Sequence, residues 1–299
     1  MNLGVDIAGV HFKNPVIAAS GTFGFGKEFA EYIDLNQLGG ICSKGLTLAK
    51  NLGNKGIRIY ETSSGIMNSI GLQNPGINYF VNTELPFMLE KDTITIANLG
   101  GHSIEDYVRG AEILNDTQVP MIELNISCPN VKEGGMAFGT VPSKANEVIS
   151  KVRAATDKPL IVKLSPNVGS IGDFARLAQD AGADAISLVN TFNAMAIDIK
   201  AKAPVFVNKT AGLSGPAIKP IALRMVYEAA HAVDIPVIGM GGIMNYKDAL
   251  EFIMAGASAV QVGTANFIDY NSMIDIVDDI KNYMREEKIE DIKEITGII

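Results

Sequence analysis

The sequence has two cysteines, Cys42 and Cys128, and a thiol can be a buried structural group, a metal ligand, half of a disulfide or a catalytic group. Cys128 follows a short apolar run in E-L-N-I-S-C-P-N (123–130), where it lies between Ser127 and Pro129. A thiol with an ordinary pKa of about 8.5 becomes a usable base when nearby positive charge lowers that pKa. Cys42 lies inside an apolar run and is typical of a small buried side chain. Cys128 stays open at this point between a buried thiol and a reactive one.

Short β-branched runs recur along the whole chain, and each is followed by a turn and a helical pattern or a longer excursion. Eight runs are predicted as strands: 16–19, 41–44, 94–98, 121–125, 160–164, 185–190, 237–242 and 259–264. Continuous apolar strands that alternate with helices indicate a parallel sheet covered on both faces. Eight such units in 299 residues predict an α/β fold, a (β/α)8 TIM barrel, and one domain over 1–299. A doubly wound sheet is disfavoured, because G-T-F-G-F-G (21–26) has the wrong spacing for a dinucleotide turn.

Three further features are expected around the barrel. The first dozen residues predict a small hairpin that caps its bottom, and 45–93 and 191–216 predict long excursions over its active face. Helices are expected to begin near Ser103 and to cover roughly 171–181. The acidic segment near the C-terminus is first of all an outer barrel helix with one solvated side.

Composition narrows the class of protein. The formal net charge is −8 and no Lys/Arg cluster occurs, which argues against nucleic-acid binding. No apolar run is long enough to span a membrane, and no signal peptide is indicated. Two cysteines cannot ligate an iron–sulfur cluster, and three scattered histidines show no metal-ligand spacing, so no metal is expected. A reducing, cytoplasmic setting is the interpretation.

Polar residues close several of the predicted strands, and in a barrel those C-terminal ends form the active face. They are Ser20, Lys44, Asn98, Asn125, Lys163 and Asn190. Any one asparagine there is more often a turn or cap residue, but convergence of six polar ends favours a site. Lys44 and Lys163 end apolar runs without a carboxylate run beside them, so they need an anionic partner.

Glycines close the last two predicted strands, in G-M-G-G-I (239–243) and V-G-T (262–264). Bare backbone N–H groups at this position of a barrel commonly bind phosphate, although tight turns without a ligand remain an alternative. Lysines and amides around a phosphate anchor suit flavin mononucleotide (FMN). A flavin-free lyase or isomerase with a Schiff base on Lys163 would use the same phosphate loops. A flavin-binding interaction subunit without catalysis is a third reading.

The sequence resembles the dihydroorotate dehydrogenase family along essentially its whole length. The stretches that carry the resemblance are S-G-T-F-G-F-G (20–26), S-K-G (43–45), N-S-I-G-L-Q-N-P-G (68–76), N-I-S-C-P-N (125–130), K-L-S-P-N (163–167), G-L-S-G-P-A-I-K-P (212–220) and G-M-G-G-I (239–243). A cysteine at 128 is typical of the soluble class 1 enzymes. The F-G-F-G and L-Q-N-P-G stretches are similar to the NAD-linked class 1B catalytic subunit more than to the fumarate-using class 1A enzymes.

The resemblance implies the role of each site residue. Flavin binding is implied for Ser20, Lys44, Gly45, Asn98, Asn125, Lys163, Val189, Gly215, Gly241, Gly242, Gly263 and Thr264. Substrate binding is implied for Lys44, Asn68, Ser69, Ile70, Gly71, Leu72, Asn125, Asn130, Asn190 and Thr191. Cys128 would take the C5 proton of (S)-dihydroorotate while the C6 hydride passes to FMN N5, giving orotate for pyrimidine (UMP) synthesis.

Reduced flavin must be reoxidised, and this chain has no dinucleotide fingerprint and too few cysteines for a cluster. The resemblance implies that electrons reach NAD through a partner subunit with FAD and a [2Fe–2S] cluster. The assembly would be a heterotetramer around a homodimer of this chain. Two positions depart from the family pattern: F-N-A-M lacks a glycine before the methionine after Asn193, and Ala211 replaces a glycine.

Overall fold

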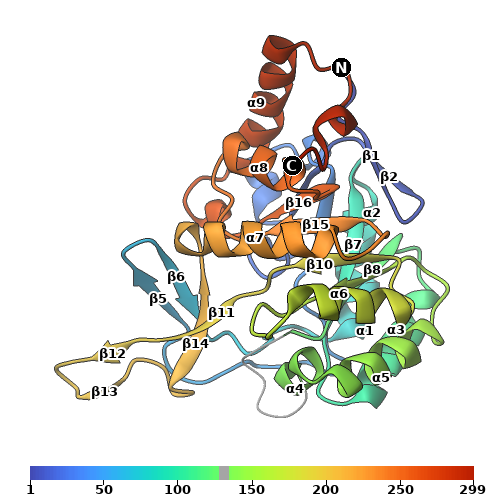
Figure 1. The fold of residues 1–299 in the computed structure, drawn as a ribbon. Coiled ribbons are helices and arrows are strands. Elements are labelled where there is room, and N and C mark those ends of the chain that lie inside the picture. Colours follow the sequence, from blue (N-terminus) through green and yellow to red (C-terminus); the bar gives the residue numbers. More distant parts are fainter. Residues whose placement is uncertain (128–134) are drawn as a thin grey trace.

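The structure, a computed structural model, describes residues 1–127 and 135–299, and the side chains of 135–137 are not described. Its centre is a closed barrel of eight parallel strands (Figure 1), which confirms the predicted TIM barrel. The barrel strands are β3 (Val16–Ala18), β4 (Gly40–Cys42), β7 (Ile94–Leu99), β8 (Met121–Asn125), β9 (Leu160–Lys163), β10 (Ala185–Leu188), β15 (Val237–Met240) and β16 (Ala259–Val262). Every one of them overlaps a run that the sequence predicted as a strand.

Helices connect the barrel strands and cover their outer face (Figure 1). The α-helices are α1 (Ile77–Tyr79), α2 (Leu85–Leu89), α3 (Ile104–Asn115), α4 (Gly135–Thr140), α5 (Pro142–Arg153), α6 (Ile171–Asp180), α7 (Lys219–Ala230), α8 (Tyr246–Met254) and α9 (Ser272–Glu287). Short helical turns lie at Phe29–Glu31, Leu35–Gln37, Phe80–Glu84, Pro216–Ile218, Thr264–Phe267 and Ile292–Ile295. Ser103 caps α3 as expected: its hydroxyl accepts from the Asp106 N–H, and the Asp106 carboxylate accepts from the Ser103 N–H. Helix α9 is an outer helix, as predicted, because Met273, Ile276 and Ile280 are buried against the barrel.

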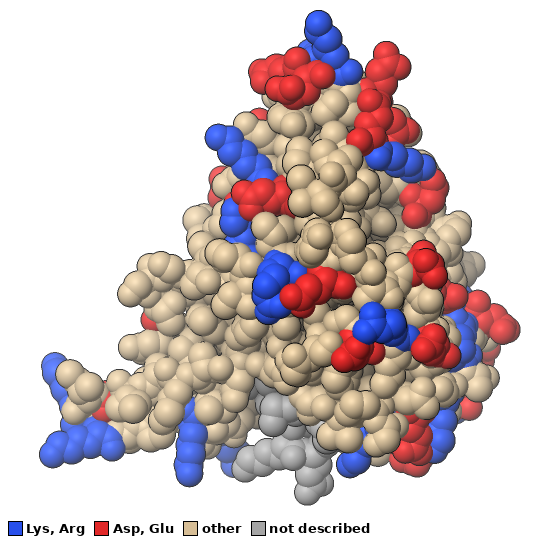
Figure 2. All heavy atoms as spheres, viewed as in Figure 1, with Lys and Arg blue, Asp and Glu red and all other residues tan. Residues whose placement is uncertain are grey.

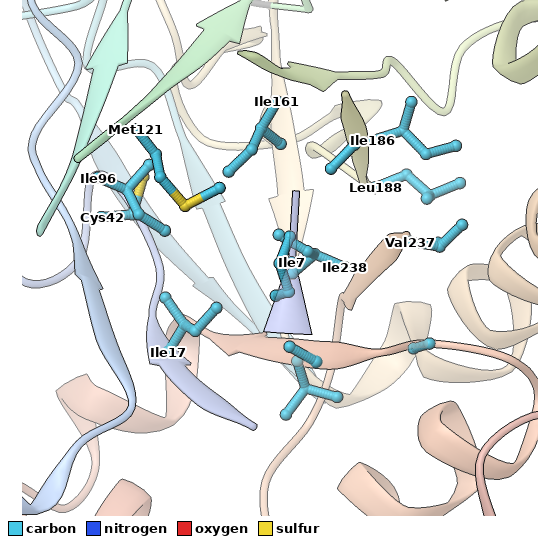
Figure 3. Close-up of a cluster of buried hydrophobic side chains, with 14 of the residues drawn as sticks. Ile7, Ile17, Cys42, Ile96, Met121, Ile161, Ile186, Leu188, Val237 and Ile238 are labelled. Carbon is cyan, nitrogen blue, oxygen red and sulfur yellow. The ribbon is translucent and has the colours of Figure 1, made fainter. Parts of the chain in front are cut away.

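The N-terminal hairpin closes one end of the barrel. Strands β1 (Val5–Ile7) and β2 (Val10–Phe12) pair antiparallel, which confirms the predicted hairpin. Figure 3 shows Ile7 among buried side chains of the barrel strands, including Ile17, Met121 and Ile161. Burial of this apolar end leaves the opposite end of the strands available for a site.

The two long excursions form one antiparallel sheet over that opposite end. Strands β5 (Ile59–Thr62) and β6 (Gly65–Asn68) come from the first excursion, and β11 (Phe192–Met195) and β14 (Thr210–Ser214) come from the second. Their order is β11-β14-β6-β5, so β14 and β6 join the two excursions. A second pair, β12 (Ile197–Asp198) and β13 (Ala203–Pro204), projects beyond this sheet (Figure 1).

Charge is distributed unevenly over the visible face. Figure 2 shows Lys and Arg side chains at the outer end of the excursions, next to a broad uncharged area. Acidic and basic side chains are mixed over α9 and over the other outer helices that this view shows. Within the described part of the chain, no helix is both long enough and apolar enough to cross a membrane.

Candidate flavin and substrate site

A cavity of about 390 Å³ lies between the C-terminal ends of the barrel strands and the excursion sheet. Its floor includes Lys163 of β9 and Gln261 of β16, and Ile59 and Ile66 of the excursion sheet line it from above. The cavity is more apolar than polar, with a few convergent polar groups, which is typical of a small-molecule site.

Most of the residues singled out in the sequence line this cavity. From the flavin set these are Ser20, Lys44, Gly45, Asn125, Lys163, Val189, Gly241, Gly242, Gly263 and Thr264. From the substrate set they are Asn68, Ile70, Gly71, Leu72, Asn190 and Thr191, together with Lys44 and Asn125. The structure therefore brings together side chains from the first excursion and from strand ends spread over the whole barrel.

Three of the predicted residues that the structure describes do not line the cavity. Asn98 is fully buried beneath it, and Ser69 is buried where its hydroxyl accepts from the Asn54 amide at 3.0 Å. Gly215 lies behind the wall, where its carbonyl would be 2.8 Å from a side chain placed on Gly242. Cys128 and Asn130 lie outside the described residues.

The glycine loops after β15 and β16 have the close-packed geometry that the phosphate hypothesis requires. Gly242 has a φ of +77°, and a Cβ there would also lie 2.8 Å from the Lys219 Cβ. A helical turn begins directly after Gly263, and the first N–H groups of a helix have no intrahelical acceptor. Backbone donors next to bare glycines can approach an anion closely. These residues therefore fit a phosphate group.

The two lysines of the site differ in electrostatic environment. Burial lowers the pKa of Lys44, and the charge of Glu28 only partly opposes this effect. In the described part of the chain, Lys44 has no carboxylate within 4 Å, so the anionic partner expected for it is not supplied there. Lys163 has the anionic partner that the sequence analysis expected, because its Nζ lies 3.6 Å from Glu123 Oε1.

Glu123 is a residue of the site that the sequence analysis missed. It lies on β8, fully buried, and its carboxylate accepts from Asn98 Nδ2 at 2.6 Å and from Gln261 Nε2 at 2.7 Å. The Ser187 hydroxyl donates at 2.8 Å and the Cys42 thiol at 3.3 Å. Burial favours the neutral acid, but Lys163 and these hydrogen bonds outweigh it and hold the pKa of Glu123 below its ordinary value. The available signal was its position two residues before Asn125, which puts both on one face of the strand.

A chain of hydrogen bonds leads from Glu123 to the substrate side of the cavity. Asn98 turns its amide nitrogen to Glu123 and its oxygen to Asn125 Nδ2 at 3.3 Å. Asn125 Oδ1 accepts from the Ser127 hydroxyl at 3.1 Å, and that hydroxyl accepts from Asn190 Nδ2 at 2.8 Å. The amides predicted to bind flavin and substrate are therefore parts of one network.

Comparison with known proteins agrees with this arrangement. A family model described as dihydroorotate dehydrogenase matches residues 2–284. The chain belongs to the dihydroorotate dehydrogenase family. A relative from Petrotoga mobilis is 61% identical over 295 residues, which is 99% of this chain and 98% of the relative. Relatives from Thermoanaerobacter pseudethanolicus and Bacteroides thetaiotaomicron are 57% and 54% identical over 99% and 100% of this chain, and 98% and 99% of their own lengths.

All three relatives are named "Dihydroorotate dehydrogenase B (NAD(+)), catalytic subunit". Membership in the dihydroorotate dehydrogenase family makes the chain an oxidoreductase by family, so the lyase or isomerase alternative finds no support. The family resemblance deduced from N-S-I-G-L-Q-N and N-I-S-C-P-N is confirmed. The two departures from the family pattern lie in a regular ladder, where Ala211 pairs with Ala194 and packs beside Met67 and Phe206.

Proposed function

We propose that this chain oxidises (S)-dihydroorotate to orotate, a step of pyrimidine synthesis, with FMN as its own cofactor. The observation that carries the proposal is the convergence of Lys44, Lys163 and Asn125 with the glycine loops on one cavity in a chain of this family. The NAD-linked names of the relatives support NAD as the final acceptor. When bound, FMN would supply a hydride acceptor next to the substrate.

The residues of this chain suit an FMN molecule in the cavity. Gly242, Gly263 and Thr264 would hold its phosphate through backbone donors, and Gly241 and Gly215 keep that wall thin. Lys163 would place positive charge beside the ring, where negative charge accumulates on reduction. Ser20, Gly45, Asn98 and Val189 complete the set proposed for the flavin.

The substrate would lie between the barrel mouth and the excursion sheet. Lys44, without an ion-pair partner among the described residues, is available to bind the substrate carboxylate. The remaining residues proposed to hold it are Asn68, Ser69, Ile70, Gly71, Leu72, Asn125, Asn130, Asn190 and Thr191. Ile59 and Ile66 cover this side of the cavity and would limit access of water.

Cys128 is proposed as the general base that removes the C5 proton. The residue lies outside the described part of the chain, so the support is its position in the sequence. It follows Ser127 directly, and Ser127 is hydrogen-bonded to both Asn125 and Asn190. A base placed there could act on a substrate held by these two amides.

A partner subunit with FAD and a [2Fe–2S] cluster is proposed to carry electrons from the flavin to NAD in the cytoplasm. The words "catalytic subunit" in the relatives' names support a second polypeptide. Exposed apolar side chains on and beside the excursion strands support a protein contact, because large apolar patches are uncommon on monomers. They are Leu52, Ile57, Ile59, Tyr60, Met195, Ile197, Ile199 and Val207. We propose a homodimer of this chain within a heterotetramer.

The test is rapid-mixing reduction of bound FMN by dihydroorotate in a single turnover. Cys128→Ala is expected to keep FMN absorbance and to slow reduction by about 10²–10⁴-fold, as the loss of a positioned base does. Gly169→Ala, at a position where an added Cβ meets no described atom within 4 Å, is the control and is expected to retain fast reduction. Reduction of the Cys128→Ala protein at the wild-type rate would exclude Cys128 as the base. A purified protein that binds no flavin would refute the proposed function itself.

A further inference from the structure

Glu123 is a fully buried carboxylate in the barrel interior to which the proposed reaction gives no role. Side chains from five other strands surround it: Cys42 of β4, Asn98 of β7, Lys163 of β9, Ser187 of β10 and Gln261 of β16. An apolar side chain would fill this layer of a barrel at lower cost, because burying a charge requires a counter-ion and several hydrogen bonds. This sequence keeps the charge and supplies all of its partners.

The counter-ion of Glu123 is a residue of the flavin site. The side chains of Lys163 and Glu123 are only 5% and 0% exposed, so water screens their interaction little. Of the groups that face Glu123, Lys163 and Cys42 can titrate, while Asn98, Ser187 and Gln261 stay neutral. The pair is therefore close to neutral as a whole, directly below the cavity.

Glu123 also determines which way the neighbouring amides point. A carboxylate accepts hydrogen bonds only, so Asn98 and Gln261 must each turn their NH2 group to it. Asn98 then offers its oxygen to Asn125, and the chain continues through Ser127 to Asn190. Gln261 is left with an Oε1 that is buried at the cavity floor and has no partner in the described structure.

We propose that Glu123 is a positioning residue of the flavin site, whose carboxylate balances the Lys163 ammonium and sets the direction of the amide chain from Asn98 to Asn190. The inference rests on the proposed function, because it assigns Glu123 an effect on bound FMN. Glu123 touches no reacting atom and acts through Lys163 and the amides.

A charge balance of this kind has a signature in the reduction potential of bound FMN. Reduction adds negative charge above Lys163, so removing the negative charge of Glu123 favours the reduced form. Removing the positive charge of Lys163 favours the oxidised form, and removing both charges restores the balance. A residue that only fills the barrel would lower stability without this pattern of signs.

The experiment measures FMN midpoint potentials, FMN dissociation constants and thermal unfolding for wild type and for Glu123→Gln, Lys163→Gln and the double variant. Glu123→Gln is expected to bind reduced FMN, relative to oxidised FMN, at least about tenfold more tightly than wild type, a rise of about 30 mV for a two-electron couple. Lys163→Gln is expected to shift the potential the opposite way, and the double variant to return near the wild-type value.

Glu123→Asp keeps the charge and serves as the conservative control, with a near-normal potential even if its unfolding temperature falls. Equal potentials in wild type and Glu123→Gln, with only a loss of stability, would overturn the inference while leaving the proposed function intact. If Glu123→Gln does not fold, equal potentials in Lys163→Gln and the double variant overturn it equally. A wild-type chain that binds no added FMN would overturn the proposed function and, with it, this inference.

Discussion

Lys44 and Lys163 lie at the C-terminal ends of two barrel strands, yet their charges are balanced differently. Lys163 has Glu123 beside it, whereas Lys44 has no carboxylate within 4 Å among the described residues. Burial of Lys44 without a counter-ion lowers its pKa from the ordinary value of 10.5. A bound carboxylate would therefore act as the counter-ion of Lys44.

This difference predicts the pH dependence of orotate binding. Because the pKa of Lys44 is lowered, its proton is lost at a lower pH than in a free lysine, and affinity for the orotate carboxylate should fall as pH rises toward 10.5. For the ligand-free protein, the pH dependence of folding stability has the opposite sign. Between the lowered pKa of Lys44 and 10.5 the unfolded chain binds more protons than the folded chain, so the free energy of unfolding rises with pH. Titration of FMN-loaded protein with orotate between about pH 7 and about pH 10 measures the effect.

Lys44→Gln is the matched variant for this titration. It should bind orotate about tenfold or more weakly, because a charged hydrogen bond is lost, and its remaining affinity should lose the part of the pH dependence due to Lys44. An unchanged pH profile in Lys44→Gln would assign the titration to another group. The FMN spectrum of each variant confirms that the flavin site is intact.

At the scale of elements, the ladder formed by β6, β14 and β11 positions substrate residues from both excursions. Gly212 pairs with Asn68 on one side and with Asn193 on the other. A Cβ on Gly212 would lie 2.0 Å from Thr191 Oγ1. The Gly212 carbonyl accepts a hydrogen bond from Asn68 Nδ2 at 3.4 Å. A glycine at this position lets Thr191 and Asn68 approach the cavity together.

Gly212→Ala is therefore expected to weaken substrate binding selectively. The added methyl must displace Thr191, and overpacking of this kind costs about 1–3 kcal/mol. Because part of that cost falls on substrate binding, the KM for dihydroorotate should rise by about tenfold. The FMN dissociation constant should stay near the wild-type value. Steady-state kinetics and an FMN titration separate the two effects.

Gly169→Ala is a suitable control, because a Cβ there has none of the described atoms within 4 Å. It should leave both constants unchanged. Equal losses of FMN and substrate affinity in Gly212→Ala would show that the ladder supports the whole cavity, and the selective role of Gly212 would then be abandoned.

The barrel strands could be predicted from the sequence because each is a continuous apolar run with a turn after it. The pairing of β6 with β14 could not, because Asn68 and Gly212 are 144 residues apart and no local pattern encodes their register. Glu123 was missed for a related reason: one acidic residue in an apolar run gives no sign of the five strands that supply its partners. Polar residues of the cavity such as Lys44, Asn125 and Lys163 were found because their types converge at strand ends, whereas Asn68 and Ile70–Leu72 came from the family resemblance. The roles of Cys128 and Asn130 stay predictions.

At the scale of the whole molecule, one hydrophobic cluster extends from Leu3 to Ile295 and joins the hairpin, the barrel and the outer helices. This continuity supports the proposal that 1–299 is a single domain. Several exposed apolar side chains, among them Leu52, Met195 and Ile199, lie outside this cluster on and around the excursions, where they form a surface suited to contact.

The chain by itself is expected to reduce NAD slowly while accepting electrons from dihydroorotate quickly. The physical reason is that the sequence offers no dinucleotide-binding fingerprint to place NAD against the flavin. Bleaching of FMN by dihydroorotate, followed with NAD or fumarate added separately, measures each acceptor with and without the candidate partner. Fast NAD reduction by the isolated chain would remove the need for a partner, and fast reoxidation by fumarate would place the chain with the fumarate-using enzymes.

The antiparallel sheet above the cavity has a consequence for the order of folding. Its central contact joins residues 144 apart, whereas neighbouring barrel strands of consecutive units are much closer along the chain. Closing a longer loop costs more chain entropy, so contacts of this separation tend to form after local ones. The antiparallel sheet of the two excursions would then form last, on a barrel that has already folded. Newly made chains would acquire their compact shape before they acquire the ability to hold a ligand.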